Sequence, residues 1–136
     1  MTAHPTHLQF INPPGLFTPP GFTHVVELTG GRTIFISGQI AVDQSFQIVG
    51  KGDFRAQAQQ VFENLKMALE AVGADFTCVV KLTIYLVDMT HLPLLREVRD
   101  RYVNMQRPPA STAVEVRKLA LDDLLLEIEA VASLPA

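Results

Sequence analysis

The sequence predicts a single α+β domain, and three observations lead to this fold class. Segments with the two-residue alternation of β-strands precede, separate and follow two segments with the three- and four-residue spacing of amphipathic helices. No internal repeat and no linker interrupts the 136 residues, a length that suits one domain with its own core. Hydrophobic residues are 48% of the chain and charged residues 18%, as in folded globular proteins. The expected order of elements is β-β-(β)-α-β-α-β-β.

The N-terminal part is predicted to be an extended lead-in followed by a β-hairpin. Residues 1–22 contain two Pro-Pro-Gly units, and both residue types favour turns. Gly30 and Gly31 predict the tight turn of the hairpin. The elements expected after the lead-in are a strand over 24–28, a strand over 33–42, and a loop over 43–52 with a short third strand over 47–49 as the alternative.

An apolar stripe with both ends marked indicates the first helix. Asp53 is the predicted N-cap, because an aspartate side chain accepts hydrogen bonds from the free amides of the first turn. Gly73 stands where the helix should end, since glycine adopts the left-handed conformation of a C-terminal cap. The apolar positions of the stripe are Phe54, Ala58, Val61, Leu65, Leu69 and Val72.

The second half of the chain is predicted to contain a strand, a helix and two further strands. β-Branched residues indicate the first of these strands, and Pro108 and Pro109 are expected to end the helix. The last two strands are expected to be joined by a short turn. The predicted ranges are 79–88 for the first strand, a start at Thr90 or His91 for the helix, and 111–118 and 124–132 for the last strands.

Two helices can cover only one face of the expected sheet of four to six strands. In the strand over 79–88, alternation puts Leu82 on one side and Lys81, Thr83 and Tyr85 on the other. The second side is too apolar for open water and too polar for a dry core. We therefore expect the sheets of neighbouring subunits to associate and to leave clefts lined by Ser, Gln, Thr and Glu.

Charge and composition exclude several functions. The net charge of −3 offers no basic surface for a phosphate backbone, so nucleic acid is not the expected partner. The apolar runs are far shorter than a membrane span, and no secretory signal is visible at the N-terminus. Cys78 is the single cysteine and excludes an intrachain disulfide. The four histidines lack the spacing of a metal site. We expect a cytoplasmic protein without a metal.

Four blocks of the sequence have the residues and the order of one known family. The blocks are Ile36-Ser37-Gly38-Gln39-Ile40, the helical segment with Gln57 and Phe62-Glu63-Asn64-Leu65, the strand over 80–88, and the segment over 107–129. Together they resemble the RidA/YjgF family of imine and enamine deaminases. The resemblance implies a chorismate-mutase-like α+β fold, with a mixed sheet and two helices packed on one face. It also implies a homotrimer with small-molecule clefts between subunits and no metal or organic cofactor.

The activity that this resemblance implies is hydrolysis of reactive 2-imino or enamino acids to 2-keto acids and ammonia. In the family an arginine holds the substrate carboxylate in a fork, and a glutamate helps to place the attacking water. Glu127 matches that glutamate and is the expected catalytic residue. Ser37 and Gly38 match the strand whose backbone lies beside the cleft, so we expect them to bind substrate.

The chain departs from the family at three cleft positions, which are still expected to bind the ligand. Ser111 stands at the place of the arginine, Ala113 at that of a frequent cysteine, and Phe22 at that of a tyrosine. A hydroxyl contributes about 1 kcal/mol through a hydrogen bond, whereas a charged donor contributes about 1.5–3 kcal/mol. Arg107 and Arg117 are interpreted as surface charges. We therefore expect negligible 2-imino acid deamination and favour a neutral or cationic ligand.

Three functions are compatible with the sequence. The first is hydrolysis of an imine, an enamine or a related electrophile, with Glu127 positioning water. The second is a non-catalytic trimer that binds a ligand for regulation and has kept the clefts. The third, action on RNA, is least favoured because the net charge is −3.

Overall fold

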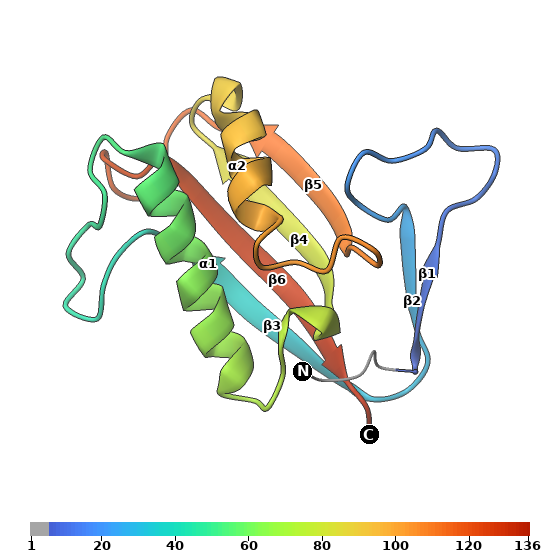
Figure 1. Cartoon of the computed structure of the whole chain (residues 1–136). Coiled ribbons are helices and arrows are strands. Elements are labelled where there is room, and N and C mark those ends of the chain that lie inside the picture. Colours follow the sequence, from blue (N-terminus) through green and yellow to red (C-terminus); the bar gives the residue numbers. More distant parts are fainter. Residues whose placement is uncertain (1–5) are drawn as a thin grey trace.

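Two helices lie on one face of a four-stranded sheet in the computed structural model, which describes residues 6–136 (Figure 1). The strands in spatial order are β3 (Arg32–Gln39), β6 (Leu126–Leu134), β4 (Val79–Leu86) and β5 (Ala110–Glu115). β6 is antiparallel to both of its neighbours, whereas β4 and β5 run parallel. The predicted α+β class with a mixed sheet and two helices on one face is confirmed.

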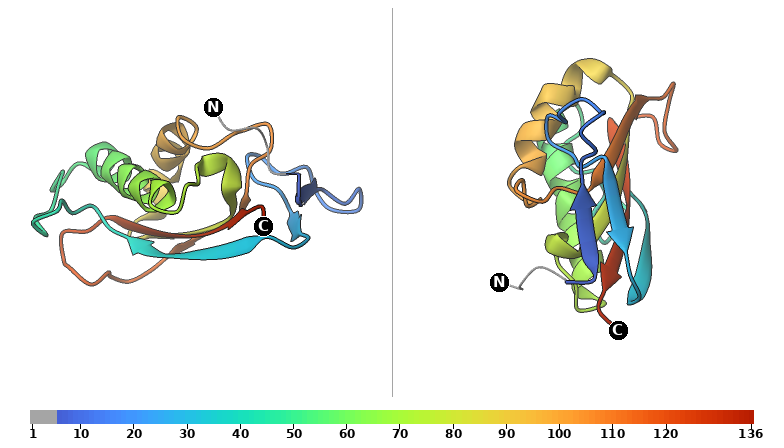
Figure 2. Two further views of the ribbon diagram at one scale, coloured as in Figure 1. Left: turned by 90° about the horizontal axis from the view of Figure 1, so that it is seen from below. Right: turned by 90° about the vertical axis from the view of Figure 1, so that its right-hand side faces the viewer.

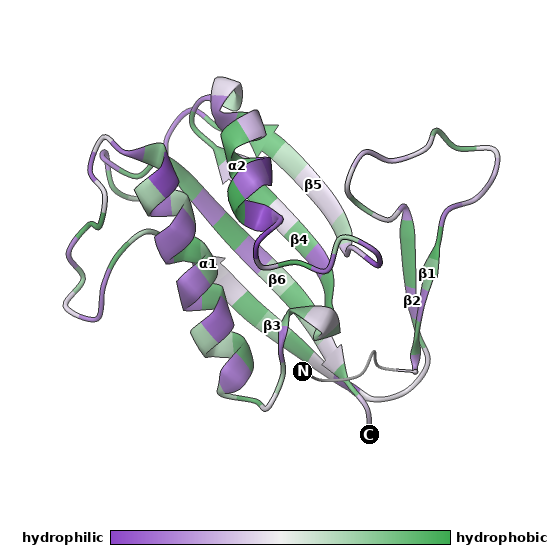
Figure 3. Ribbon diagram, viewed as in Figure 1, coloured by the Kyte–Doolittle hydropathy of each residue, from purple (hydrophilic) through white to green (hydrophobic). Residues whose placement is uncertain are grey.

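The helix α1 (Phe54–Glu70) begins where the sequence predicts. Asp53 is its N-cap, and Oδ1 of Asp53 accepts a hydrogen bond from the backbone N of Ala56 at 3.1 Å. Gly73 follows the helix with a φ of 76°, which glycine adopts without steric cost. Polar and apolar residues alternate around α1 (Figure 3). Its buried side faces the sheet and carries Phe54, Gln57, Ala58, Val61, Phe62, Leu65 and Leu69.

The second helix is shorter than predicted. It is α2 (Leu92–Arg99), and the 3₁₀ turn η2 (Met89–His91) leads directly into it. Another 3₁₀ turn, η1 (Phe76–Cys78), precedes β4. The predicted start is confirmed, but the predicted end at Pro108 is wrong. The helix ends early because turn hydrogen bonds follow it. The amide of Tyr102 donates to the carbonyl of Arg99 at 2.9 Å, and the amide of Gln106 donates to Oδ1 of Asn104 at 3.0 Å. Turns therefore replace the helix before the prolines.

A separate two-stranded sheet contradicts the predicted hairpin. β2 (Val25–Leu28) pairs with β1 (Leu8–Ile11), which lies in the lead-in, and β3 pairs with β6. Gly30 and Gly31 do form a turn, with φ values of 71° and 87°. The turn carries the chain from one sheet to the other. A side chain at residue 31 would collide with the Leu134 carbonyl at the end of β6, so glycine is needed there.

The loop predicted over 43–52 is confirmed, and its alternative, a third strand over 47–49, is reduced to a single bridge between Val42 and Ile48. The short turn predicted between the last two strands is wrong. Residues 116–125 join β5 to β6, so their connection is no short turn, and β4 separates the two strands. β4 and β5 pair in parallel, and the crossover that parallel strands need contains α2.

One face of the main sheet is covered by α1 and α2, and the other carries no helix (Figure 2, left). On the covered face Leu82, Ile84 and Ile128 are buried, and each such side chain contributes about 1.5–3 kcal/mol through the hydrophobic effect. On the other face the ring of Phe35 is 81% exposed. The alternation predicted for β4 is confirmed. We call the face of the main sheet that carries no helix the bare face.

Candidate functional site

Glu127 lies against the backbone of Gly38 on the bare face. It points to this side because it alternates along β6 with the buried Leu126 and Ile128. A Cβ atom at residue 38 would collide with the Glu127 carboxylate, so any side chain there would displace that group. The structure thus brings the predicted catalytic glutamate next to the predicted Ser-Gly strand.

β3 is irregular where it passes Glu127. Its register against β6 shifts between Ile36 and Gln39, and the exposed Ser37 and the half-buried Gly38 lie in this β-bulge. Nε2 of Gln39 donates a hydrogen bond to the carbonyl of Ser37 at 3.0 Å. Bulges re-aim side chains and are frequent next to functional sites. We call Ser37, Gly38 and Glu127 the Glu127 cluster.

Polar pairs surround this cluster on the bare face. The hydroxyl of Tyr85, the β4 residue opposite Glu127, donates a hydrogen bond to Oε1 of Glu129 at 2.6 Å. This hydrogen bond to Glu129 raises the pKa of Tyr85 above its usual value. Nζ of Lys81 donates to Oγ1 of Thr112 at 2.6 Å. The bare face is therefore an ordered polar surface with acidic and basic groups.

Phe22, Ser111 and Ala113 line a cavity of about 220 Å³ on the other side of the sheet. Ser111 is the register partner of the buried Leu82, so its side chain belongs to the helix-covered face. The apolar part of the wall is completed by Ile84, Leu92 and Leu95. We call this space the Ser111 cavity. Its wall therefore contains all three cleft residues at which the sequence differs from the family pattern.

Hydrogen bonds from Thr23 hold Phe22 at the cavity. Thr23 is buried, its amide donates to the carbonyl of Pro109 at 3.2 Å, and its hydroxyl donates to the carbonyl of Pro108 at 2.5 Å. These two prolines directly precede β5, which carries Ser111. The N-terminal segment and β5 therefore meet at one point, and this contact brings two walls of the cavity together.

Arg96 and Arg99 of α2 also line the Ser111 cavity, and the sequence interpretation missed both. Arg99 is only 8% exposed. A signal was present, because Arg99 follows Leu95 by four residues and Leu92 by seven, on the apolar stripe of the helix. The prediction of a neutral or cationic ligand assumed a cleft without a cation, and these two guanidinium groups remove that assumption.

The Glu127 cluster and the Ser111 cavity are separate within one chain. They lie on opposite faces of the main sheet, and Glu127 is not part of the cavity wall. A substrate held in the cavity of one chain thus has no access to Glu127 of the same chain. The six predicted site residues therefore fall into two separate groups.

Other candidate residues have structural partners. The guanidinium of Arg107 lies 4.8 Å from the centre of the Phe10 ring. His24 packs against Phe17 and Phe22, and its Nε2 lies 2.7 Å from the carbonyl of Phe17. Among residues 6–136, no group of three His, Cys, Asp or Glu side chains is placed to hold a metal ion. Within the same range, neither helix has the length and apolarity that crossing a membrane requires.

A second, wider hollow of about 510 Å³ lies between η1 and the turns after α2. Tyr102 lines it, and its hydroxyl donates to Oε2 of Glu63 at 2.7 Å. Burial, with the carboxylate of Glu63 beside the phenol, raises the pKa of Tyr102 to about 12. None of the predicted site residues lies in this hollow.

The chain is similar to one family and to several characterised structures. The family model described as Endoribonuclease L-PSP matches residues 19–134. A RutC family protein of Pyrococcus horikoshii is 42% identical over 105 residues, which are 77% of this chain and 82% of that protein. The human 2-iminobutanoate/2-iminopropanoate deaminase is 39% identical over 101 residues, which are 74% of this chain and 72% of that protein. The crystal structure of a Rid-family protein of unknown function from Yersinia pestis has a TM-score of 0.82 at 36% identity, covering 95% of this chain and all of that one.

Proposed function

The chain belongs to the family described as Endoribonuclease L-PSP, the RidA/YjgF family that its motifs resemble, and we propose that it binds a small metabolite in clefts between the subunits of a homotrimer. The proposed reaction is hydrolysis of an imine, an enamine or a related electrophile. A relative from human is named for a reaction of this kind. We propose that the protein works in the cytoplasm without a metal or an organic cofactor.

The position of Glu127 is the observation that supports this proposal. Its carboxylate lies beside Gly38 on the bare face, away from the Ser111 cavity. A second copy docked on this face would bring its own cavity to the Glu127 cluster and complete the site. The exposed ring of Phe35 supports such docking, because a contact would remove its apolar surface from water.

The proposed chemistry needs a positioned water and a proton carrier. The Glu127 carboxylate accepts a hydrogen bond from water and takes one of its protons as the water oxygen attacks the imine carbon. The C=N electron pair moves to nitrogen, which is protonated. The resulting carbinolamine loses ammonia as the C–N bond breaks and a C=O bond forms. One imine and one water thus give one carbonyl compound and one ammonia.

A non-catalytic ligand-binding trimer is the second candidate. Ser111, Ala113 and Phe22 favour it, because they lack the charge, thiol and phenol of the matched family positions. Both candidates use the same clefts and differ only in turnover. Cleavage of RNA, which the family description names, is not proposed, because the net charge of −3 opposes binding of a polyanion.

The experiment that separates the two candidates measures ammonia release from freshly generated 2-iminobutanoate. Ser111 alone predicts negligible deamination, but Arg96 and Arg99 supply guanidinium groups to the same cavity. We therefore expect turnover by the natural chain and a loss of about 100-fold in kcat/KM for Glu127→Gln. Glu129→Gln is the matched control, since Glu129 lies two residues further on the same face of β6. Equal activity of Glu127→Gln and the natural chain would refute the catalytic role. No turnover by the natural chain would leave the non-catalytic candidate.

The trimer is tested separately by sedimentation equilibrium. The expected mass is three times the chain mass of 15.0 kDa. Phe35→Glu should lower this mass, because a carboxylate placed on the bare face would have to be desolvated at the contact. A monomeric natural chain would contradict the proposed clefts.

A further inference from the structure

Arg99 is the one charged residue buried in the part of the chain that the structure describes, with 8% of its surface exposed. Burying a guanidinium is unfavourable unless its donors are used. Nε and Nη2 donate to the same oxygen, Oδ1 of Asp100, at 3.0 and 2.9 Å. Nη1 makes no hydrogen bond to any of residues 6–136. One edge of the planar group is thus bound, and another is free.

The Arg99 guanidinium packs closely against the backbone of Gly21. A Cβ atom at residue 21 would be 2.7 Å from Nη2 and 3.4 Å from both Nη1 and Cζ. Gly21 also has a φ of 133°, a conformation that other residues rarely adopt. The segment that carries Gly21 and Phe22 therefore packs against the guanidinium of Arg99 on α2.

The Ser111 cavity places this charge next to the position that lacks the family arginine. Arg99 and Ser111 line the same space of about 220 Å³, which has room for roughly seven water molecules. Arg96 adds a second, exposed guanidinium to the wall. Two cations thus stand against the single carboxylate of Asp100, whose side chain is 49% exposed. The remaining wall is largely apolar, which strengthens the attraction of a bound anion.

We propose that Arg99 takes over the carboxylate-binding role of the arginine that Ser111 replaces, so that the ligand of the Ser111 cavity is a small carboxylate. The free Nη1 of Arg99 and the hydroxyl of Ser111 donate to the ligand oxygens. The guanidinium of Arg99 comes from the helix α2, whereas the residue that it replaces in this role would stand on the strand β5. This inference rests on the proposed function, since it names the substrate class of the same clefts, and it reverses the preference for a neutral or cationic ligand.

Butanoate and butanamide are suitable probes, because they have similar shapes and differ in charge. With the natural chain, we expect butanoate to shift the Nε–H signal of Arg99 in a nitrogen-15 spectrum. Butanoate should also bind at least about tenfold more tightly than butanamide, the difference expected for a charge-assisted contact. Equal affinities, or an unshifted Arg99 signal at saturation, would overturn the inference. This measurement needs no variant and no turnover.

Arg99→Lys and Arg101→Lys form the matched pair of variants. Lysine keeps the charge but loses the planar fork, so Arg99→Lys should weaken butanoate binding about tenfold and leave butanamide unchanged. Arg101→Lys, two residues on and exposed, should change neither by more than about twofold. If Arg99→Lys does not fold, the nitrogen-15 spectrum of the natural chain with butanoate tests the carboxylate role of Arg99 without a variant. Unchanged butanoate binding by a folded Arg99→Lys would overturn the inference.

The imine assay separates this inference from the proposed function. Hydrolysis of 2-iminobutanoate with an unchanged KM in Arg99→Lys would overturn the carboxylate role of Arg99 and keep the proposed reaction. Arg99-dependent binding of butanoate without any hydrolysis would support the carboxylate role and refute the proposed reaction.

Discussion

Replacing Gln57 by leucine should lower the free energy of unfolding by about 3–5 kcal/mol, although the two side chains are similar in size. Gln57 is fully buried in α1. Its Nε2 donates to the carbonyls of Gly50 at 3.2 Å and Asp123 at 2.9 Å, and its Oε1 accepts from the amide of Leu125 at 2.9 Å. The same bonds position the chain two residues before Glu127.

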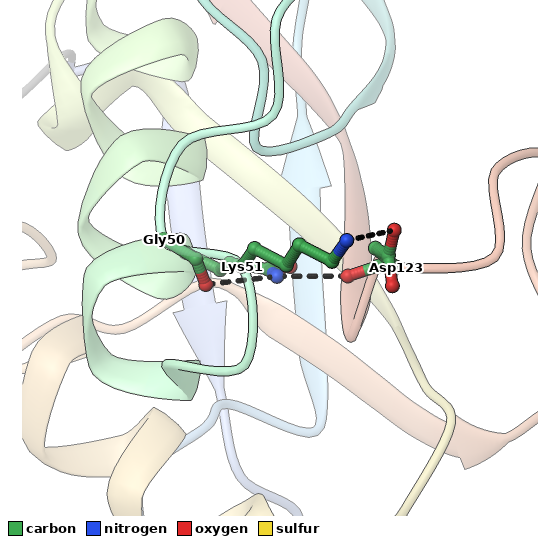
Figure 4. A network of polar contacts seen from close by, with 4 residues as sticks. Gly50, Lys51 and Asp123 are labelled. Atoms are coloured by element: carbon green, nitrogen blue, oxygen red, sulfur yellow. Dashed lines mark hydrogen bonds and ion pairs between the residues drawn. The ribbon is translucent and has the colours of Figure 1, made fainter.

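The magnitude follows from these three hydrogen bonds. Each contributes about 1 kcal/mol, and a buried group left without a partner costs about 1–3 kcal/mol. Water recovers part of the loss, because Asp123 is exposed. The ion pair between Lys51 and Asp123, 3.5 Å apart in the same network (Figure 4), is 75% and 46% exposed. We expect it to add little.

Urea unfolding followed by circular dichroism measures the effect. The protein concentration is kept constant, because association of subunits also stabilises the fold. Gln59→Leu is the control: Gln59 is half-buried in the same helix and makes no side-chain hydrogen bond to any of residues 6–136, so its loss should cost less than about 0.5 kcal/mol. A loss of unfolding free energy below about 1 kcal/mol in Gln57→Leu would show that these bonds do not hold α1 to the loop at Gly50 and to the chain at Asp123 and Leu125.

Three further predictions concern a cap, a contact and two phenols. Asp53→Ala should lower the free energy of unfolding by about 1 kcal/mol in urea, because the first turn of α1 loses its side-chain acceptor; no change would mean that water replaces it. Gly38→Ala should displace the Glu127 carboxylate and lower imine hydrolysis about tenfold or more with an unchanged circular dichroism spectrum; full activity would contradict the position assigned to Glu127. Tyr85 and Tyr102 both have raised pKa values, about 12 for Tyr102, so absorbance should show little tyrosinate at pH 10. The folded state holds the Tyr102 proton more tightly than the unfolded chain, so the contribution of Tyr102 to stability should be complete below pH 10 and be lost as the pH rises from 10 to about 12; ionisation of both phenols near pH 10 would contradict this.

The sequence was informative where structure depends on nearby residues. The apolar stripe and Asp53 predict α1 because cap and stripe act within a few residues of each other. The partner of a strand is decided by contacts far along the chain. Gly30 and Gly31 predict a turn, and they form one, but no hairpin results because β2 pairs with β1 and β3 pairs with β6.

The site shows the same division. Local motif matching placed Glu127 beside Ser37 and Gly38, and it placed Ser111 and Ala113 together on β5. It could not show that these two groups lie on opposite faces, because the face of each side chain depends on the register of β5 and β6 against β4. Arg99 was missed because a charge on an apolar stripe looks like an interruption of the stripe, and its burial depends on Gly21, far away in sequence.

The two hydrogen bonds of Thr23 have a consequence for ligand choice. They join the segment with Phe22 to the residues directly before Ser111, so one hydroxyl and one amide help to set the distance between these two walls. The size of the ligand that fits between them should depend on these contacts. Thr23→Val, which removes the hydroxyl and retains the shape, would widen the range of accepted guests without altering the charge that attracts them.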